Sequence, residues 1–177
     1  RQVLAMSASA ALGRKTDQLI IDVLDAGSNS NNVVHGSTGL TLAKALTVYE
    51  AFGEGDVPDD GQRYFVVSPA GWADLLQIDQ FSRMEYVGEA DLPYAGGLTA
   101  KRWLGFMWFT HSGLSISGTT RDCHAFHRTA VGVGMGSDIR SEINYIPEKV
   151  SNLITSYMSM GAVMIDNNGA IECQITE

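Results

Sequence analysis

The fold is decided by residues 137–175, which read SDIRSEINYIPEKVSNLITSYMSMGAVMIDNNGAIECQI. Ser137–Pro147 and Val150–Asp166 alternate outward and inward side chains, which is the two-residue period of long strands. Asn167–Gly169 predicts a tight hairpin turn, because Asn-Gly tolerates positive φ, and Ala170–Ile175 predicts a further strand after it. Long paired strands without a catalytic signature favour a building block over an enzyme.

The faces of the two long strands differ in chemistry. In the first strand, an apolar face lies opposite a face of charged and amide side chains: Arg140, Glu142 and Asn144. Alternating charge on an outward face suits ion pairs across the strands or between subunits. One face of the second strand is rich in methionine: Met158, Met160, Ala162 and Met164. Methionines at alternate positions make a compliant apolar surface, which we expect to be core rather than a cofactor site.

Two helices are predicted in the first third of the chain. Arg1–Ala26 has apolar residues at steps of three and four, and it ends at Gly27 before a run of Ser and Asn. Thr41–Phe52 predicts a second helix with Thr41 as its N-cap and Gly53 as its stop. Its apolar face is expected to carry Leu42, Leu46 and Tyr49, with Ala45 and Phe52 beside them.

The middle of the chain predicts an αβ unit followed by irregular segments. Arg63–Val67 reads as a strand that runs into a helix at Ser68-Pro69, with Ser68 as the cap. A nucleophile elbow would need Gly-x-Ser-x-Gly, which is absent there. Residues 81–98 predict a mobile surface loop. Trp103–Phe109 predicts one short, buried strand.

Composition narrows the classes of function. The 177 residues have a net charge of −8, and 45% are hydrophobic, enough for a core that buries about 70% of the surface. Sequence-specific nucleic-acid binding is not expected, because it needs clustered Lys and Arg. No apolar run approaches the roughly 20 residues of a membrane span, so no membrane partner is expected. Cys123 and Cys173 are expected to be reduced, buried thiols of a cytosolic protein.

Three patterns invite a binding-site interpretation. Cys123, His124 and His127 could ligate zinc, but a structural zinc site needs four ligands and only His111 is near enough in sequence to add one. The simpler interpretation places His124 and His127 on a half-exposed strand or turn.

The other two patterns are an acidic turn and a glycine run. Asp56, Asp59 and Asp60 lack the spacing of an EF-hand calcium loop. The run Gly132, Gly134 and Gly136 lacks the Gly-x-Gly-x-x-Gly dinucleotide fingerprint, and it favours close approach of a neighbouring backbone or large side chain. No catalytic, cofactor-binding or metal-binding residue is therefore predicted.

The segments together resemble a known family. The runs that carry the resemblance are RYFVVSPAGWADLL (63–76), WLGF (103–106), RDCHAFHRTAVGV (121–133), DIRSEINY (138–145) and SMGAVMID (159–166). These runs follow a long and a short helix along the chain. In this order they resemble the C-terminal two-thirds of a tailed-bacteriophage major capsid protein of the Hong Kong 97 phage type. Ser68-Pro69 with Trp72 resembles the strand-to-helix step of that family's axial domain, and the final strands resemble its peripheral domain.

The resemblance implies an α+β fold and a structural role. Residues 1–38 and 138–166 would form part of a peripheral domain with a spine helix and long strands. Residues 39–137 and 167–177 would form an axial domain with a mixed sheet flanked by helices. The family's subunits assemble into hexamers and pentamers of an icosahedral shell around double-stranded DNA, in the virion, after assembly in the bacterial cytoplasm. Implied partners are copies of the chain, DNA without sequence-specific contacts, and scaffold, portal or decoration proteins.

Two alternatives stay open. An encapsulin-like compartment shell shares the fold, and a metal-binding enzyme domain around His124 and His127 is a different class of protein. The family's N-terminal arm and extended loop do not precede Arg1 in this sequence. We therefore expect that upstream sequence is missing, and that this chain folds without forming complete shells.

Overall fold

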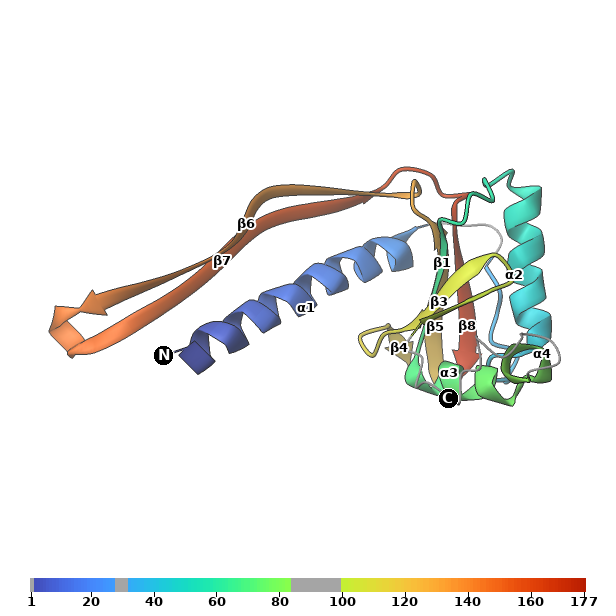
Figure 1. Cartoon of the computed structure of the whole chain (residues 1–177), viewed down its shortest axis with the longest axis horizontal. Coiled ribbons are helices and arrows are strands. Elements are labelled where there is room, and N and C mark those ends of the chain that lie inside the picture. The colour runs from blue at the N-terminus through green and yellow to red at the C-terminus, as the bar shows by residue number, and fades with distance from the viewer. Residues whose placement is uncertain (1, 28–31, 84–99) are drawn as a thin grey trace.

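The computed structural model describes residues 2–27, 32–83 and 100–177, and it divides into two parts (Figure 1). The arm consists of the helix α1 (Gln2–Ala26) and a hairpin of two long strands, β6 (Val131–Ile146) and β7 (Ser151–Met164). The body contains a six-stranded sheet with three shorter helices. Among the described residues, no helix is long and apolar enough to cross a membrane.

The body sheet is mixed. Its strand order is β2-β3-β1-β5-β4, and β8 also pairs with β5. Only β1 and β3 run parallel to each other, and the other pairs are antiparallel. The strands are β1 (Arg63–Val67), β2 (Ala100–Trp103), β3 (Phe106–Thr110), β4 (Ile116–Ser117), β5 (Thr120–His127) and β8 (Ala170–Thr176).

The core lies between one face of this sheet and the helices α2 (Leu42–Glu54), α3 (Pro69–Gln77) and α4 (Asp79–Ser82). Its centre is aromatic: the rings of Phe65 and Trp108 stack with centroids 4.0 Å apart. Such stacked pairs add to the stabilisation that burial alone provides. The other face of the sheet receives the C-terminal half of α1.

The two predicted N-caps are confirmed. The Thr41 hydroxyl accepts a hydrogen bond from the Lys44 backbone N–H at the start of α2, and Ser68 Oγ accepts one from Gly71 N at 3.0 Å. Each cap satisfies one of the N–H groups that a helix start leaves unpaired. The predicted stop at Gly53 was two residues early, because α2 ends at Glu54 and is capped by Gly55.

The predicted buried face of α2 was partly wrong. Leu46 and Tyr49 are 45% and 44% exposed. The buried residues are Lys44, Ala45, Val48, Ala51 and Phe52. Lys44 lies on this buried face, where its ammonium group binds carbonyl oxygens inside the body.

The aromatic run Trp103–Phe109 is not one strand. It contains the end of β2, a turn at Leu104-Gly105, and most of β3, and β2 pairs antiparallel with β3. Gly105 has φ 77°, in the left-handed region that glycine adopts without strain. Of the predicted loop over residues 81–98, Phe81 lies buried in α4. Residues 84–98 lie outside the described residues.

The long strands of the arm are confirmed, and β6 begins earlier than predicted, at Val131. They pair with each other across a turn at Pro147–Lys149, where Val150 has φ 48°. The prediction that Asn167–Gly169 closes a hairpin was wrong. The strand after it, β8, pairs with β5 of the body and not with β7. The turn therefore carries the chain from the arm into the body sheet.

Candidate functional site

Much of the β6–β7 ribbon is left uncovered by the described part of the chain. It extends away from the body, and α1 runs alongside it (Figure 1). Nearly every residue of β6 is exposed, whereas β7 alternates between exposed and half-buried residues. This alternation shows that α1 packs against only one face of β7.

The covered face is the methionine-rich one, as the sequence predicted. Met158, Met160 and Met164 are half-buried, and Thr16 Oγ1 of α1 lies 3.6 Å from Met158 Sδ. The opposite face of β7, which contains Tyr157 and Val163, is exposed. Flexible thioethers suit the packing of a helix against a twisted ribbon, because they fill irregular gaps.

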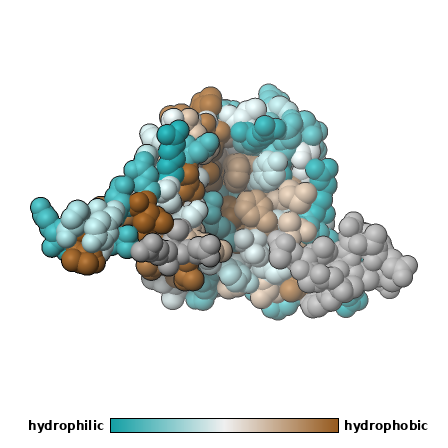
Figure 2. Space-filling model, turned by 60° about the vertical axis from the view of Figure 1, so that its left-hand side comes forward, coloured by the Kyte–Doolittle hydropathy of each residue, from teal (hydrophilic) through white to brown (hydrophobic). Residues whose placement is uncertain are grey.

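Apolar side chains remain exposed along the whole ribbon. Ten of them are at least 39% exposed: Val133, Met135, Ile139, Ile143, Tyr145, Val150, Leu153, Tyr157, Val163 and Ile165. Figure 2 shows hydrophobic side chains, in brown, lying among hydrophilic ones, in teal, on the face turned toward the viewer. Extended apolar surface of this kind marks an interaction site in a soluble protein.

The backbone of the ribbon is also available for pairing. Its sheet has only two strands among the described residues, so each strand has a second edge with N–H and C=O groups that no further strand pairs. Register shifts between Met135 and Ser137 and between Ser137 and Arg140 interrupt the ladder. Such bulges bend and twist a strand, and they lie where the ribbon bends in Figure 1.

The glycine run has a mixed outcome. A side chain at Gly132 would meet Ile165 Cδ1 at 2.8 Å, so the predicted close approach of a large side chain is confirmed there. Gly134 lies opposite Gly161, and nothing would contact a Cβ at either position. At this point neither strand of the ribbon carries a side chain, and the surface above the backbone is open.

The polar side chains of the ribbon make hydrogen bonds rather than ion pairs. Tyr157 Oη donates to Glu142 Oε1 at 3.0 Å, and this bond raises the pKa of Tyr157. Ser141 Oγ and Ser156 Oγ lie 2.7 Å apart. Within the described residues no ion pair joins β6 to β7, so the predicted pairing across the strands was wrong. Pairing between subunits stays a prediction.

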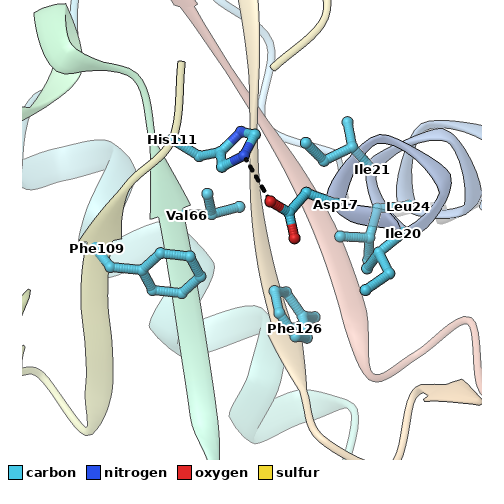
Figure 3. Close-up of a pocket in the computed structure, with 8 residues that line it drawn as sticks. All are labelled: Asp17, Ile20, Ile21, Leu24, Val66, Phe109, His111 and Phe126. Carbon is cyan, nitrogen blue, oxygen red and sulfur yellow. Dashed lines mark ion pairs between the residues drawn. The ribbon is translucent and has the colours of Figure 1, made fainter. Parts of the chain in front are cut away.

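Polar contacts and an apolar cavity form the joint between α1 and the body. The cavity, of about 150 Å³, is lined mainly by Ile20, Ile21, Leu24, Val66, Phe109 and Phe126 (Figure 3). At its edge, His111 Nε2 lies 3.7 Å from Asp17 Oδ2, as the dashed line in Figure 3 marks. Further along α1, His124 Nε2 lies 2.7 Å from Asp25 Oδ1, and Ser115 Oγ also donates to Asp25.

Carboxylates crowd around His124. Burial acts to raise the pKa of Asp25, but hydrogen bonds from His124 and Ser115 hold it below its ordinary value. Burial and the neighbouring Asp25 raise the pKa of Asp122, whose Oδ1 is buried without a hydrogen-bond partner. Burial likewise raises the pKa of Glu172.

The candidate zinc ligands do not converge. His124 and His127 point to opposite faces of β5, because their separation of three residues is odd. His127 Nε2 lies 3.0 Å from Asp60 Oδ1 on the far side of the sheet from α1. Both histidines are buried, at 1% and 2% exposure, so the prediction of half-exposed histidines was wrong. In the described part of the chain, no three His, Cys, Asp or Glu side chains form a group that could hold a metal.

The cysteines match their prediction of buried, free thiols. Cys123 and Cys173 lie opposite each other on β5 and β8, and burial raises the pKa of each thiol to about 12. A thiol with so high a pKa carries almost no reactive thiolate at neutral pH.

Sequence reasoning missed two charged side chains that organise the structure. Asp25 adjoins the buried Leu24 near the end of α1, and Lys44 falls on the buried stripe of α2 with Val48 and Ala51. For Lys44, a single charge on an otherwise apolar helix face is the signal that could have identified it, because a buried charge needs a partner. Asp25 has no such signal, because α1 also places Asp17 against the body.

A protein-family model and several solved structures match this chain. The model of a protein family described as phage capsid protein matches residues 1–177. Comparison with curated proteins found no match. Among solved structures, the chain is similar to one from Mycobacterium phage Che8, with 19% identity and a TM-score of 0.74, over 95% of this chain and 61% of that one.

Two other solved structures are similar. The capsid structure of Cyanophage P-SCSP1u has 17% identity and a TM-score of 0.76, over 100% of this chain and 66% of that one. The holo-SrpI encapsulin complex from Synechococcus elongatus has 10% identity and a TM-score of 0.67, over 98% and 64%. The chain thus spans 61% to 66% of the length of these three chains.

Proposed function

The chain belongs to the phage capsid protein family, and from this premise we propose that it is a structural major capsid protein that assembles with copies of itself into a shell. Its α+β fold is the capsid fold of the Hong Kong 97 phage type, as the sequence resemblance implied. The proposed domains follow that fold. Residues 1–38 and 138–166 belong to a peripheral domain, and residues 39–137 and 167–177 belong to an axial domain.

The observation that carries the proposal is the uncovered ribbon. A two-stranded ribbon is only marginally stable by itself in water. Here α1 covers one face of β7, while apolar side chains such as Ile143 and Val163 stay exposed. Contacts with neighbouring subunits would remove this surface from water, at about 25 cal/mol for each Å² of apolar area buried. In this proposal the arm provides the surface for assembly, and the body provides the part of the subunit that is stable by itself.

In the proposed shell, subunits group into hexamers and pentamers with icosahedral symmetry and enclose double-stranded DNA. The net charge of −8 suits a wall that contains DNA without reading its sequence. The location is the capsid of the virion, assembled in the cytoplasm of a bacterial host. Scaffold, portal or decoration proteins are further proposed partners.

We propose no enzymatic activity, and no catalytic, cofactor or metal site. The histidines and cysteines that could have formed one have structural partners or are inert. His124 is bound to Asp25, His127 is bound to Asp60, and both thiols have raised pKa values.

An encapsulin-like compartment is the second candidate, favoured by the similarity to the encapsulin from Synechococcus elongatus. The two candidates differ in cargo. Particles purified from cells after nuclease treatment would contain protected double-stranded DNA if the protein is a phage capsid, and enclosed protein without DNA if it is a compartment shell.

A matched pair of substitutions tests whether the arm drives assembly. Ile143 on the arm and Leu46 on the body are 49% and 45% exposed, so Lys at either position should leave the subunit fold intact. In the full product of the gene, Ile143→Lys should reduce the mass fraction in closed particles at least about tenfold, because it places a charge in a buried contact. Leu46→Lys should keep assembly near the wild-type level. Equal assembly of the Ile143→Lys variant and the wild type, by mass photometry and electron microscopy, would contradict the proposal.

A further inference from the structure

The ammonium group of Lys44 sits in a cage of backbone oxygens inside the body. The side chain leaves α2 on its buried face, and the residue is only 8% exposed. Its Nζ lies 2.7 Å from the carbonyl oxygen of His35, 2.8 Å from that of Thr38 and 3.0 Å from that of Gly39. A fourth carbonyl oxygen, of Gln174 in β8, lies 3.0 Å away.

The number of oxygens exceeds what an amine can satisfy one to one. An ammonium group has three N–H bonds, whereas four carbonyl oxygens lie within 3.0 Å of Nζ. The four oxygens therefore surround the positive charge as a whole, and they do not each lie along an N–H bond of their own. Rings of backbone carbonyl oxygens are also how proteins replace the hydration shell of potassium. Potassium and ammonium ions are similar in radius, and both carry a single charge.

The cage joins two segments that connect the arm to the body. Three of its oxygens come from the connector between α1 and α2, where Gly36 and Ser37 have φ 54° and 55°. The fourth comes from β8, the strand that follows β7. Direct backbone bonds support the same junction: Gln174 N donates to Val33 O at 2.8 Å, and Thr176 N donates to Thr38 O at 3.0 Å.

The left-handed turn of the connector aims its carbonyl groups inward. Without a cation, three oxygens of one short segment would face each other across a small buried space. Two of the oxygens have other donors, because Thr38 N donates to His35 O and Thr176 N donates to Thr38 O. These bonds leave the repulsion between the converging carbonyl dipoles, which would favour opening of the connector. A positive charge at the centre of the four oxygens removes this repulsion.

We propose that the carbonyl oxygens of His35, Thr38, Gly39 and Gln174 form a monovalent-cation site whose resident cation is the Lys44 ammonium group. The occupied site holds the α1–α2 connector against β8. When the lysine side chain is removed, the same site accepts potassium or ammonium from solution. Larger organic cations such as choline do not fit.

The test compares three variants. Lys44→Ala empties the site and leaves room for an ion, Lys44→Met fills most of the same space without a charge, and Lys15→Ala removes an exposed lysine of α1 as a control. Hydrogen exchange is followed for residues 33–40 and 170–176, together with the thermal midpoint. Solutions of potassium, ammonium and choline chloride are matched in ionic strength, so that general screening is equal.

In choline chloride, Lys44→Ala should exchange both segments at least about tenfold faster than Lys15→Ala, because the two segments open together. Potassium or ammonium should restore part of the protection and raise the midpoint of Lys44→Ala, but should leave Lys44→Met unchanged. Two results would overturn the proposal: exchange in Lys44→Ala equal to that of the control, or the same response of Lys44→Ala and Lys44→Met to the cations.

Amine labelling of the wild-type protein provides a second arm that does not depend on a variant folding. In a brief pulse of acetic anhydride, Lys44 should react at least about tenfold more slowly than Lys15, because the caged amine is released only when the connector opens. Equal labelling rates at the two positions would overturn the proposal by themselves.

Discussion

The body and the arm use the same kinds of side chain for different purposes. In the body, Phe65 and Trp108 are fully buried, and the caps and the Lys44 cage satisfy polar groups near the core. In the arm, Ile143, Tyr145 and Val163 are as apolar but remain exposed. The body thus completes its core within one chain, whereas the arm leaves apolar surface uncovered. Stability and assembly should therefore respond to substitutions in different places.

The largest effect on stability is expected in the aromatic core. Phe65→Ala removes a fully buried ring that stacks on Trp108, and it should lower the free energy of unfolding by about 3–5 kcal/mol. Chemical denaturation followed by tryptophan fluorescence measures this change. A loss below about 1 kcal/mol would contradict the view of the body as the self-sufficient part.

The next largest effect on stability is expected where α1 of the arm contacts the body. His124→Ala leaves Asp25 without its imidazole partner and should lower the free energy of unfolding by about 1–3 kcal/mol. Hydrogen exchange should show faster opening at the C-terminal end of α1. Asp22→Asn is a matched control, because Asp22 is exposed on the same helix and bonds only Gln18 in the structure.

The same joint makes a pH-dependent contribution. Since the pKa of Asp25 is held below its ordinary value of 3.8, its stabilisation is present above that pH. The stabilisation is lost as the pH falls through the lowered pKa. In His124→Ala the acid limb of the stability curve should be shallower than in wild type. Identical acid limbs in the variant and the wild type would show that the contact between His124 and Asp25 does not contribute to the pH dependence of stability.

A smaller effect of opposite sign is expected at Asp122. Its pKa is raised by burial and by Asp25, so its ionised form opposes folding at neutral pH. Asp122→Asn should raise the free energy of unfolding by up to about 1 kcal/mol at pH 7. The gain should shrink as the pH falls below the raised pKa, because the wild-type carboxyl is then protonated. Asp138→Asn, at an exposed arm residue, is the control and should change stability by less than about 0.5 kcal/mol.

The smallest effect on subunit stability is expected on the arm itself. Ile143→Ser removes an apolar side chain that is already half exposed, so the unassembled subunit should change by no more than about 0.5 kcal/mol. Denaturation of the dissociated subunit measures this value. A loss comparable to that of Phe65→Ala would show that the ribbon is part of the subunit's own core, and the distinction between arm and body would fail.

Local patterns in the sequence predicted much of the fold. The two-residue period identified the long strands, the alternating methionines identified the apolar face of β7, and Thr41 and Ser68 marked helix starts. These features depend on a few neighbouring residues and on backbone preferences, so they can be read directly from the chain.

The errors arose where distant residues decide. Asn168-Gly169 favours a hairpin locally, but β8 pairs with β5, a partner more than 40 residues away in sequence. The aromatic run around Leu104 concealed a turn that β2–β3 pairing requires. His124 is buried because Asp25, 99 residues away, meets it. The long strands could be predicted from the alternating pattern, but the exposed area of the ribbon depends on how much of it α1 covers.

The most direct test of the account is hydrogen exchange of the ribbon in particles formed by the full gene product and in subunits dissociated from them. The account predicts that residues 131–164 exchange at least about tenfold more slowly in the particles, while strands β1 and β5 of the body exchange at the same rate in both states. Equal exchange of the ribbon in particles and in free subunits would contradict the claim that the arm is the surface through which copies of this chain assemble.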